Sequence, residues 1–213
     1  HESYAEGGAR RSAYHSMAAR VVDAALSRPP VAFAMHGHAI VGTTAPQLIV
    51  KAADALGLTV EVPPGISALD SLFADLMFDP VAEGAQMFEA TDMLLRRRPI
   101  QNDLPLILWQ VGNVESCLHT TKPSRPERFR RLQSYPLQFY PPEQEAKALF
   151  ASPHPLAPSV IDCIAIGDLT KVAEKLHPGI TVFIPPLFQR AIADTEVLAL
   201  LTSPEHLARI AKD

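Results

Sequence analysis

The sequence lacks the features that mark several classes of protein. Two cysteines, Cys117 and Cys163, are too few for a disulfide framework, so we expect a reducing compartment. No apolar run approaches the roughly 18 residues of a membrane-spanning helix, and the chain opens without a signal-peptide pattern. Basic residues form no long stripe and the formal net charge is −4. We therefore expect a cytoplasmic protein that binds neither nucleic acid nor membrane.

What the sequence does contain is typical of a folded protein. Its 213 residues suffice for one large or two small domains. Twenty prolines gather mainly in residues 123–158 and 178–186. Apolar segments continue between these prolines, which indicates a loop-rich second half that is folded.

The first part of the chain alternates helix and strand patterns. Apolar residues from Ser12 to Leu26 recur at helical spacing, which predicts an amphipathic helix that ends before Pro29. Two more helices are predicted, from Thr44 to Gly57 and from Ser67 to Met77, the latter with a capping-box-like start. Continuous apolar runs predict buried strands at 31–35 and 58–62.

The second part begins at Asp79-Pro80, which we predict to be a junction between domains 1–79 and 80–213. Apolar runs predict strands over residues 85–90, 104–111, 146–151, 160–166 and 180–184. Helices are predicted over residues 126–135, 169–176 and 191–212, the last broken near Ser203-Pro204. Strands that alternate with helices predict an α/β fold with a largely parallel or mixed sheet.

Two tyrosines and an arginine near the start could carry chemistry. Tyr4, Arg10 and Tyr14 lie within eleven residues, and Arg10 and Tyr14 share one helix face at the i, i+4 spacing. Arg11 is an alternative to Arg10. Tyr14 also lies on the apolar stripe of its helix, so a core tyrosine with its hydroxyl at the rim is the competing interpretation.

Three turns could form a ligand site. Gly37 lies between His36 and His38 after a predicted strand, where open α/β sheets bind ligands. Pro64-Gly65-Ile66-Ser67-Ala68 opens a helix whose first N–H groups are free. Gln110-Val111-Gly112 ends another strand. No further metal-binding residues accompany the two histidines, so no metal site is expected.

These motifs, with Leu72-Phe73-Ala74-Asp75-Leu76, Phe88-Glu89-Ala90-Thr91-Asp92 and Ile184-Pro185-Pro186, resemble the tetrapyrrole-methylase superfamily. Within it, the chain looks most like the borosin branch, which methylates peptide backbone amides. The resemblance implies two α/β domains with S-adenosylmethionine and substrate in the cleft between them, and a homodimer. It also implies an N-terminal strand and glycine-rich loop that are missing before His1.

The resemblance assigns roles to individual residues. It implies Tyr14 as the base, with Arg10 and Tyr4 orienting and polarising the amide. The cofactor-binding residues that it implies are His36, Gly37, His38, Val41, Ser67, Ala68, Gln110, Val111, Gly112 and Pro185. Ala39 stands where the family usually has proline, and His36 stands where the borosin branch often has tyrosine. Glu89 and Asp92 are expected to cap a helix or face solvent, or to touch the substrate.

The implied function is S-adenosylmethionine-dependent N-methylation of backbone amides in a ribosomally made precursor peptide. No repetitive apolar core peptide is visible before Asp213, so we expect a precursor that is a separate molecule. One alternative is methylation of a small molecule such as a tetrapyrrole. Another is a scaffold that keeps the fold without turnover, which His36, Ala39 and the missing loop favour.

Overall fold

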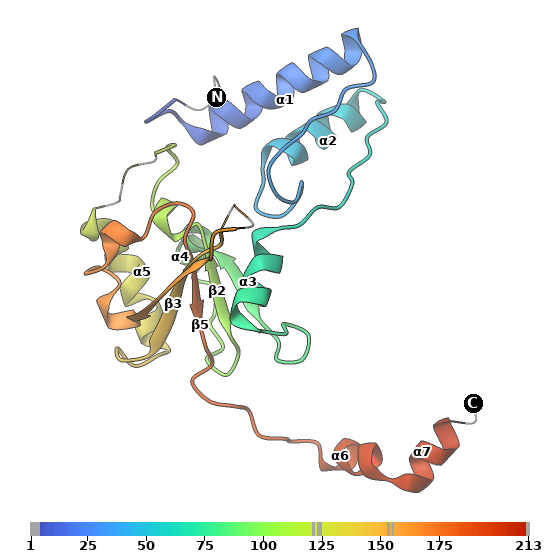
Figure 1. Cartoon of the computed structure of the whole chain (residues 1–213), viewed down its shortest axis with the longest axis vertical. Coiled ribbons are helices and arrows are strands. Elements are labelled where there is room, and N and C mark those ends of the chain that lie inside the picture. The colour runs from blue at the N-terminus through green and yellow to red at the C-terminus, as the bar shows by residue number, and fades with distance from the viewer. Residues whose placement is uncertain (1–4, 121, 123–124, 153, 155, 212–213) are drawn as a thin grey trace.

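The computed structural model describes residues 5–120, 122, 125–152, 154 and 156–211. Tyr4, one of the predicted catalytic residues, lies outside the described residues. A mixed five-stranded sheet forms the centre of the molecule (Figure 1). Two helices lie beyond one end of the sheet, and the C-terminal helices extend from the other end.

The sheet has the order β1-β2-β5-β3-β4. Its strands are β1 (Gln86–Glu89), β2 (Leu106–Trp109), β3 (Glu145–Phe150), β4 (Val160–Ala165) and β5 (Thr181–Ile184). β1 and β2 are parallel, and the other pairings are antiparallel. The five strands predicted from the second part of the sequence and the mixed α/β class are thus confirmed.

Alternating side chains divide the sheet into two packed faces. Leu106 and Leu108 of β2 face a core completed by Met93, Phe129 and other buried residues. That face carries α4 (Ala90–Arg96), α5 (Arg130–Ser134) and the short 3-10 helices η1 (Val111–Asn113), η2 (Pro126–Phe129), η3 (Pro136–Gln138), η4 (Ile166–Asp168) and η5 (Ala173–Lys175).

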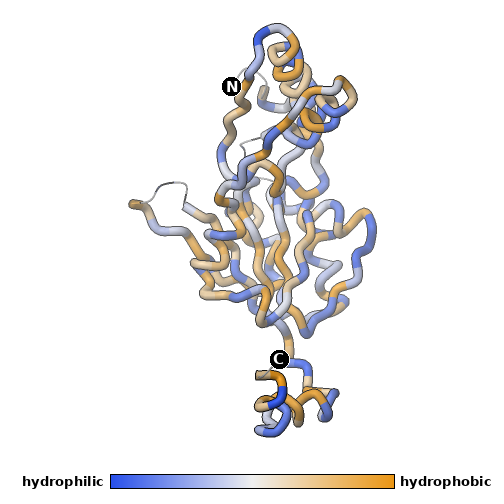
Figure 2. The backbone as a smooth tube through the Cα atoms, turned by 90° about the vertical axis from the view of Figure 1, so that its right-hand side faces the viewer, coloured by the Kyte–Doolittle hydropathy of each residue, from blue (hydrophilic) through white to orange (hydrophobic). Residues whose placement is uncertain are grey.

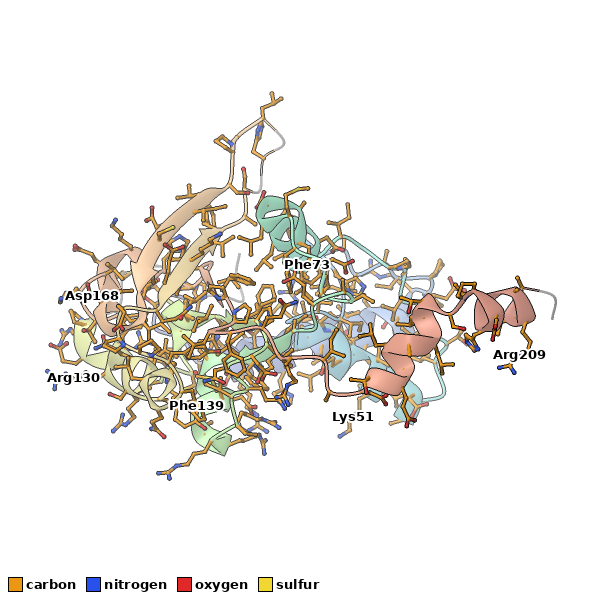
Figure 3. The ribbon with its side chains drawn as sticks, turned by 90° about the horizontal axis from the view of Figure 1, so that it is seen from below. Lys51, Phe73, Arg130, Phe139, Asp168 and Arg209 are labelled. Atoms are coloured by element: carbon orange, nitrogen blue, oxygen red, sulfur yellow. The ribbon has the colours of Figure 1, made fainter. Side chains whose placement is uncertain are left out.

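The opposite face is covered by α3 (Ala68–Leu76). Ile107 and Phe183 of the sheet pack with Leu72 and Phe78 there, and Phe73, labelled in Figure 3, contacts the same cluster. The ring centroids of Phe78 and Phe183 lie 5.5 Å apart. These contacts cross the predicted junction at Asp79-Pro80.

The N-terminal helices α1 (Arg10–Ser27) and α2 (Ala45–Ala55) pack against each other and confirm two predicted helices. The start of α1 is tied to the loop that follows η1. Gly7 donates its N–H to the carbonyl of His119 at 2.8 Å, and His119 donates to the carbonyl of Gly8 at 2.8 Å. Arg10 donates its backbone N–H to Cys117 at 2.9 Å. A short two-stranded pairing therefore anchors α1 beside the sheet.

The two strands predicted in the first part of the chain are wrong. Residues 31–35 and 58–62 follow irregular backbone, and the sheet pairings of the described residues do not include them. Val31, Phe33 and Val60 are 39%, 37% and 40% exposed. An apolar run becomes a strand only where a neighbouring strand takes up its N–H and C=O groups. The described backbone hydrogen bonds join neither run to another strand, and that of Leu58 goes to Ala53 at the end of α2.

The helix predicted over 169–176 is also wrong. Turns and the short η5 replace it, and most of its backbone bonds join residues three apart, as from Lys171 to Asp168 at 2.8 Å. Thr170 donates both its N–H and its hydroxyl to Oε1 of Gln133 at 2.9 Å. The bonds between residues three apart form short 3-10 turns in place of a continuous α-helix.

The C-terminal segment extends away from the sheet as α6 (Thr195–Thr202) and α7 (Pro204–Ile210), with a break at Ser203 as predicted. Ser203 accepts the N–H of His206 at 3.3 Å and caps α7. Neither helix has a buried residue, although apolar residues recur along them (Figure 2). Arg209 lies at the opposite end of the molecule from Asp168 (Figure 3). Within the described residues, no helix is long and apolar enough to cross a membrane.

Candidate active site

A cavity of about 900 Å³ lies at the carboxyl ends of β1 and β2, and we call it the loop cavity. Loops from both parts of the chain form its walls. Its lining includes seven predicted cofactor-binding residues: His36, Gly37, His38, Val41, Ser67, Ala68 and Gln110. The structure therefore brings together residues that lie more than seventy positions apart in the sequence.

Two glycine turns pack directly against each other in the wall of the loop cavity. Gly37 has φ +81°, a conformation that glycine adopts without strain. A Cβ on Gly65 would lie 3.1 Å from the carbonyl oxygen of Gly37, so a larger residue would push the turns apart. Nδ1 of His38 accepts the N–H of Ile40 at 3.0 Å, which closes the first turn. Gly37 lines the cavity without a side chain, so its backbone is exposed there, and Gly65 lets the second turn pack against it.

The second turn is held by a capping box at the start of α3. The Ser67 side chain accepts the N–H of Leu69 at 3.1 Å and donates to Oδ2 of Asp70 at 2.7 Å. The same carboxylate accepts the N–H of Ser67 at 2.6 Å. These hydrogen bonds from Ser67 lower the pKa of Asp70. The Ser67 hydroxyl is buried in this cap, so the cap fixes the turn that borders the cavity.

A second cavity, of about 1380 Å³, lies beside the first, and we call it the α1 cavity. Arg10, Arg11 and Tyr14 of α1 line it, together with residues of α2 and α4. The two cavities share four lining residues: Gly42, Thr43, Glu89 and Gln110. The predicted catalytic residues that the structure describes therefore border the predicted cofactor-binding loops.

Arg10 is fixed at the boundary between these cavities. Its Nη1 donates to Oε1 of Gln110 at 3.1 Å, and its Nη2 donates to the carbonyl of Ser116 at 2.6 Å. A guanidinium has five N–H donors, so further donors remain for a ligand. Arg11 lines the same cavity but is exposed. Tyr14 is half-buried, one helical turn after Arg10.

Three predicted cofactor-binding residues line neither of these cavities: Val111, Gly112 and Pro185. Val111 is completely buried in the core. A Cβ on Gly112 would lie 2.1 Å from the carbonyl carbon of His177, so only glycine lets the two backbones approach. Gly112 thereby seats His177-Pro178 next to the loop cavity, which Pro178 lines. Pro185 follows β5, and its carbonyl accepts from Gln144 at 3.4 Å.

The expected capping role of Glu89 is confirmed. Its Oε2 accepts the N–H of Asp92 at 2.7 Å at the start of α4. Asp92 pairs with Arg96 at 2.6 Å and with Arg98 at 3.1 Å. The hydrogen bond from Arg96 is the main cause of the lowered pKa of Asp92. Glu89 also lines both cavities, so the same residue caps α4 and borders the candidate site.

Sequence reasoning missed several residues that line the cavities. Trp109 is half-buried and borders the loop cavity with Phe150 and residues 178–181. Pro178-Gly179 before β5 was the available signal for this wall. On the other side, Gln47 and Lys51 of α2 line the α1 cavity. Among the described residues, no group of three or more His, Cys, Asp or Glu is placed to hold a metal ion.

Two relatives are similar to this chain in sequence over most of its length. The chain is 30% identical over 203 residues to the methyltransferase and cyclic peptide dendrothelin A precursor of Dendrothele bispora, covering 94% of this chain and 48% of that protein. It is 28% identical over 181 residues to a methyltransferase and type II borosin cyclic peptide precursor of Phlebiopsis gigantea, covering 84% and 32%. The chain thus spans half or less of the length of these relatives.

Solved structures with low sequence identity have the same fold. The methyltransferase CobJ matches with a TM-score of 0.60 at 17% identity, covering 83% of this chain and 72% of that one. Uroporphyrin-III C-methyl transferase from Thermus thermophilus, in complex with S-adenyl homocysteine, matches with a TM-score of 0.56 at 13% identity, covering 83% and 73%.

The family match covers most of the chain. Residues 2–144 match the family described as Tetrapyrrole (Corrin/Porphyrin) Methylases, and this range includes the residues of α1, both glycine turns and Gln110. The sequence motifs, the mixed sheet and the paired cavities agree with this match. The chain therefore belongs to the tetrapyrrole methylase family.

Proposed function

We propose that this chain is the methyltransferase part of a peptide backbone N-methyltransferase of the borosin type, with S-adenosylmethionine as methyl donor. The observation that carries the proposal is the shared wall of the two cavities. One cavity is lined by the residues that the family resemblance assigns to the cofactor, and the other by Arg10 and Tyr14. Relatives named as borosin cyclic peptide precursors support a peptide as the substrate.

The loop cavity has the character of a site for a nucleoside-like cofactor. Its volume of about 900 Å³ falls within the usual range for small-molecule sites. Trp109, Phe150 and Ile180 offer apolar surface, and Ser71 and Thr181 offer hydroxyl groups. The backbone at Gly37, which lines the cavity without a side chain, can approach a ligand closely. S-adenosylmethionine, when bound, supplies an electrophilic methyl group on a sulfonium sulfur and leaves as S-adenosylhomocysteine.

The protein must make an amide nitrogen nucleophilic, because its lone pair is delocalised into the carbonyl. In the proposed reaction Tyr14 would act as the base and take the N–H proton, while the amide nitrogen would form the new N–C bond to the methyl carbon that the donor's sulfonium sulfur releases. Arg10 donates to the amide oxygen and stabilises the negative charge that develops there. Because Gln110 and Ser116 hold Arg10, this donor needs little reorganisation. Tyr4 is proposed to help orient the amide.

The test is tandem mass spectrometry of a precursor peptide incubated as a separate molecule with the purified protein and S-adenosylmethionine. We expect the peptide to gain methyl groups on backbone nitrogens. Tyr14→Phe is expected to slow transfer by about 100-fold or more, as for loss of a general base. Tyr135→Phe is the matched control, because the Tyr135 hydroxyl donates to the carbonyl of Arg98 and lines neither cavity.

Other outcomes would identify the alternatives. Binding of S-adenosylhomocysteine without peptide methylation, but with methylation of a tetrapyrrole, would support a small-molecule methyltransferase. A protein that binds neither cofactor nor product in calorimetry would support the scaffold. Methylation of only a covalently attached peptide would contradict action on a separate precursor.

The proposal also includes a cytoplasmic location and a homodimer. Each chain is proposed to divide into domains 1–79 and 80–213. Light scattering coupled to size-exclusion chromatography measures the dimer. A monomer at micromolar concentration would contradict that part of the proposal and leave the chemistry unaffected.

A further inference from the structure

Gln110 has an unusual backbone at the end of β2. Its φ of 55° and ψ of 34° place it in the left-handed region, which residues with a Cβ rarely adopt. Such strain persists only where the surrounding structure fixes it, and it is frequent at functional sites. Among the described residues only Met77, Arg97 and Glu115 share this feature without being glycine.

Two neighbours fix the turn at Gln110. Its carbonyl accepts the N–H of Asn113 at 2.8 Å and begins η1. Two residues on, Gly112 lies so close to His177 that a Cβ would clash with its backbone. The chain therefore turns sharply after β2, and Gln110 is left at the boundary of the loop cavity and the α1 cavity.

The Gln110 side chain uses this place to hold Arg10. Its Oε1 accepts from Nη1 of Arg10 at 3.1 Å, across a separation of 100 residues. The carbonyl of Ser116 accepts from Nη2 at 2.6 Å. Both acceptors come from the segment after β2, so this segment sets where the guanidinium lies.

We propose that Gln110 is a positioning residue that directs Arg10 toward the amide of the substrate, and that its strained backbone serves this role. This inference rests on the proposed function. It goes beyond the contact with cofactor implied by the family resemblance, because it assigns the Gln110 side chain to the chemical step.

The variant Gln110→Gly distinguishes a residue that positions Arg10 from one that only stabilises the fold. Glycine adopts the left-handed region without strain, so Gln110→Gly removes the side chain and relieves the backbone together. A structural role predicts a lower melting temperature. Positioning predicts that the melting temperature is unchanged or raised by about 2 °C. Transfer at saturating cofactor and peptide is then expected to fall by about 100-fold, as for a misplaced catalytic group.

Two further variants complete the experiment. Met77→Gly is the matched control, because Met77 has φ 51°, ends α3 with a side chain that is 90% exposed, and lines neither cavity. It should gain the same stability and keep full transfer. Gln110→Glu keeps an acceptor oxygen for Arg10, and we expect it to restore transfer to near the wild-type rate.

A double-mutant cycle shows whether Gln110 acts through Arg10. The combined variant of Gln110→Gly and Arg10→Met should be little slower than Arg10→Met alone. Any of three results would overturn the inference: rate losses of the two single variants that multiply in the combined variant, full transfer by Gln110→Gly, or a melting temperature of Gln110→Gly that falls by several degrees. A wild-type protein that methylates no peptide would overturn the proposed function and this inference with it, and so differs from these outcomes.

Discussion

Residues 5–79 and residues 80–184 contain similarly apolar segments but use them differently. In residues 80–184 the apolar runs pair into a sheet, and the largest fully buried side chains among the described residues lie between Met93 and Ile184. In residues 5–79 the runs at 31–35 and 58–62 stay irregular and exposed. The difference teaches that an apolar run specifies a strand only together with a partner for its backbone.

The largest expected contrast comes from two phenylalanines. Phe129 is completely buried in the sheet core, whereas Phe33 is 37% exposed. Phe129→Ala should lower the free energy of unfolding by about 3 to 5 kcal/mol, and Phe33→Ala by about 1 kcal/mol or less. Urea unfolding measures both. Equal losses would show that the two regions are equally well packed and would break the comparison.

Two glycines sharpen the comparison at the level of the backbone. Gly112→Ala forces a Cβ to within 2.1 Å of His177, so we expect a loss of about 3 kcal/mol or more. Gly57 at the end of α2 has φ +68° and open space around it, so Gly57→Ala should cost only the strain of about 1 to 2 kcal/mol. Thermal unfolding monitored by circular dichroism compares them. A tolerated Gly112→Ala would contradict the close approach of the two backbones.

The smallest expected effect concerns the capping box that Ser67 and Asp70 form at the start of α3, the helix that packs against the sheet. Ser67→Ala should cost about 1 kcal/mol at neutral pH. Because Ser67 lowers the pKa of Asp70 below its usual 3.8, the part of this stabilisation that comes from the Asp70 carboxylate is present above pH 3.8 and is lost as the pH falls through the lower folded pKa. The bond from the Leu69 N–H to the Ser67 hydroxyl does not titrate, so the gap between wild type and variant should narrow in acid. Ser16→Ala, at an exposed position within α1, is the control and should show no such pH dependence.

The sequence predicts helices and their ends well, because these depend on nearby residues. The stripe of α1, the proline near the start of α2 and the cap formed by Ser67 and Asp70 all act within a few positions. The wrong prediction over 169–176 concerns the kind of turn, because most backbone bonds there join residues three apart. Over so short a segment the apolar pattern does not distinguish 3-10 turns from an α-helix.

The residues of the candidate site likewise fall into those that a local motif indicated and those that distant contacts bring to the site. Motifs indicated both glycine turns and the start of α1, and the structure brings these together. For the wall formed by Phe150 and residues 178–181 the sequence offers only the turn signal Pro178-Gly179, and the place of this wall follows from strand order. Gly112 carried a motif, but its contacts assign it to backbone packing beside the cavity.

The four residues shared by the two cavities have a consequence for the order and strength of binding. A ligand in one cavity that moves Glu89 or Gln110 changes the shape offered to a ligand in the other. Thermodynamic linkage requires this influence to be reciprocal, so the two ligands would alter each other's affinity by the same factor. Under the proposed function, loss of the methyl group from the donor would change the affinity of the α1 cavity for the peptide, and release of the cofactor product would be coupled to retention of the peptide substrate.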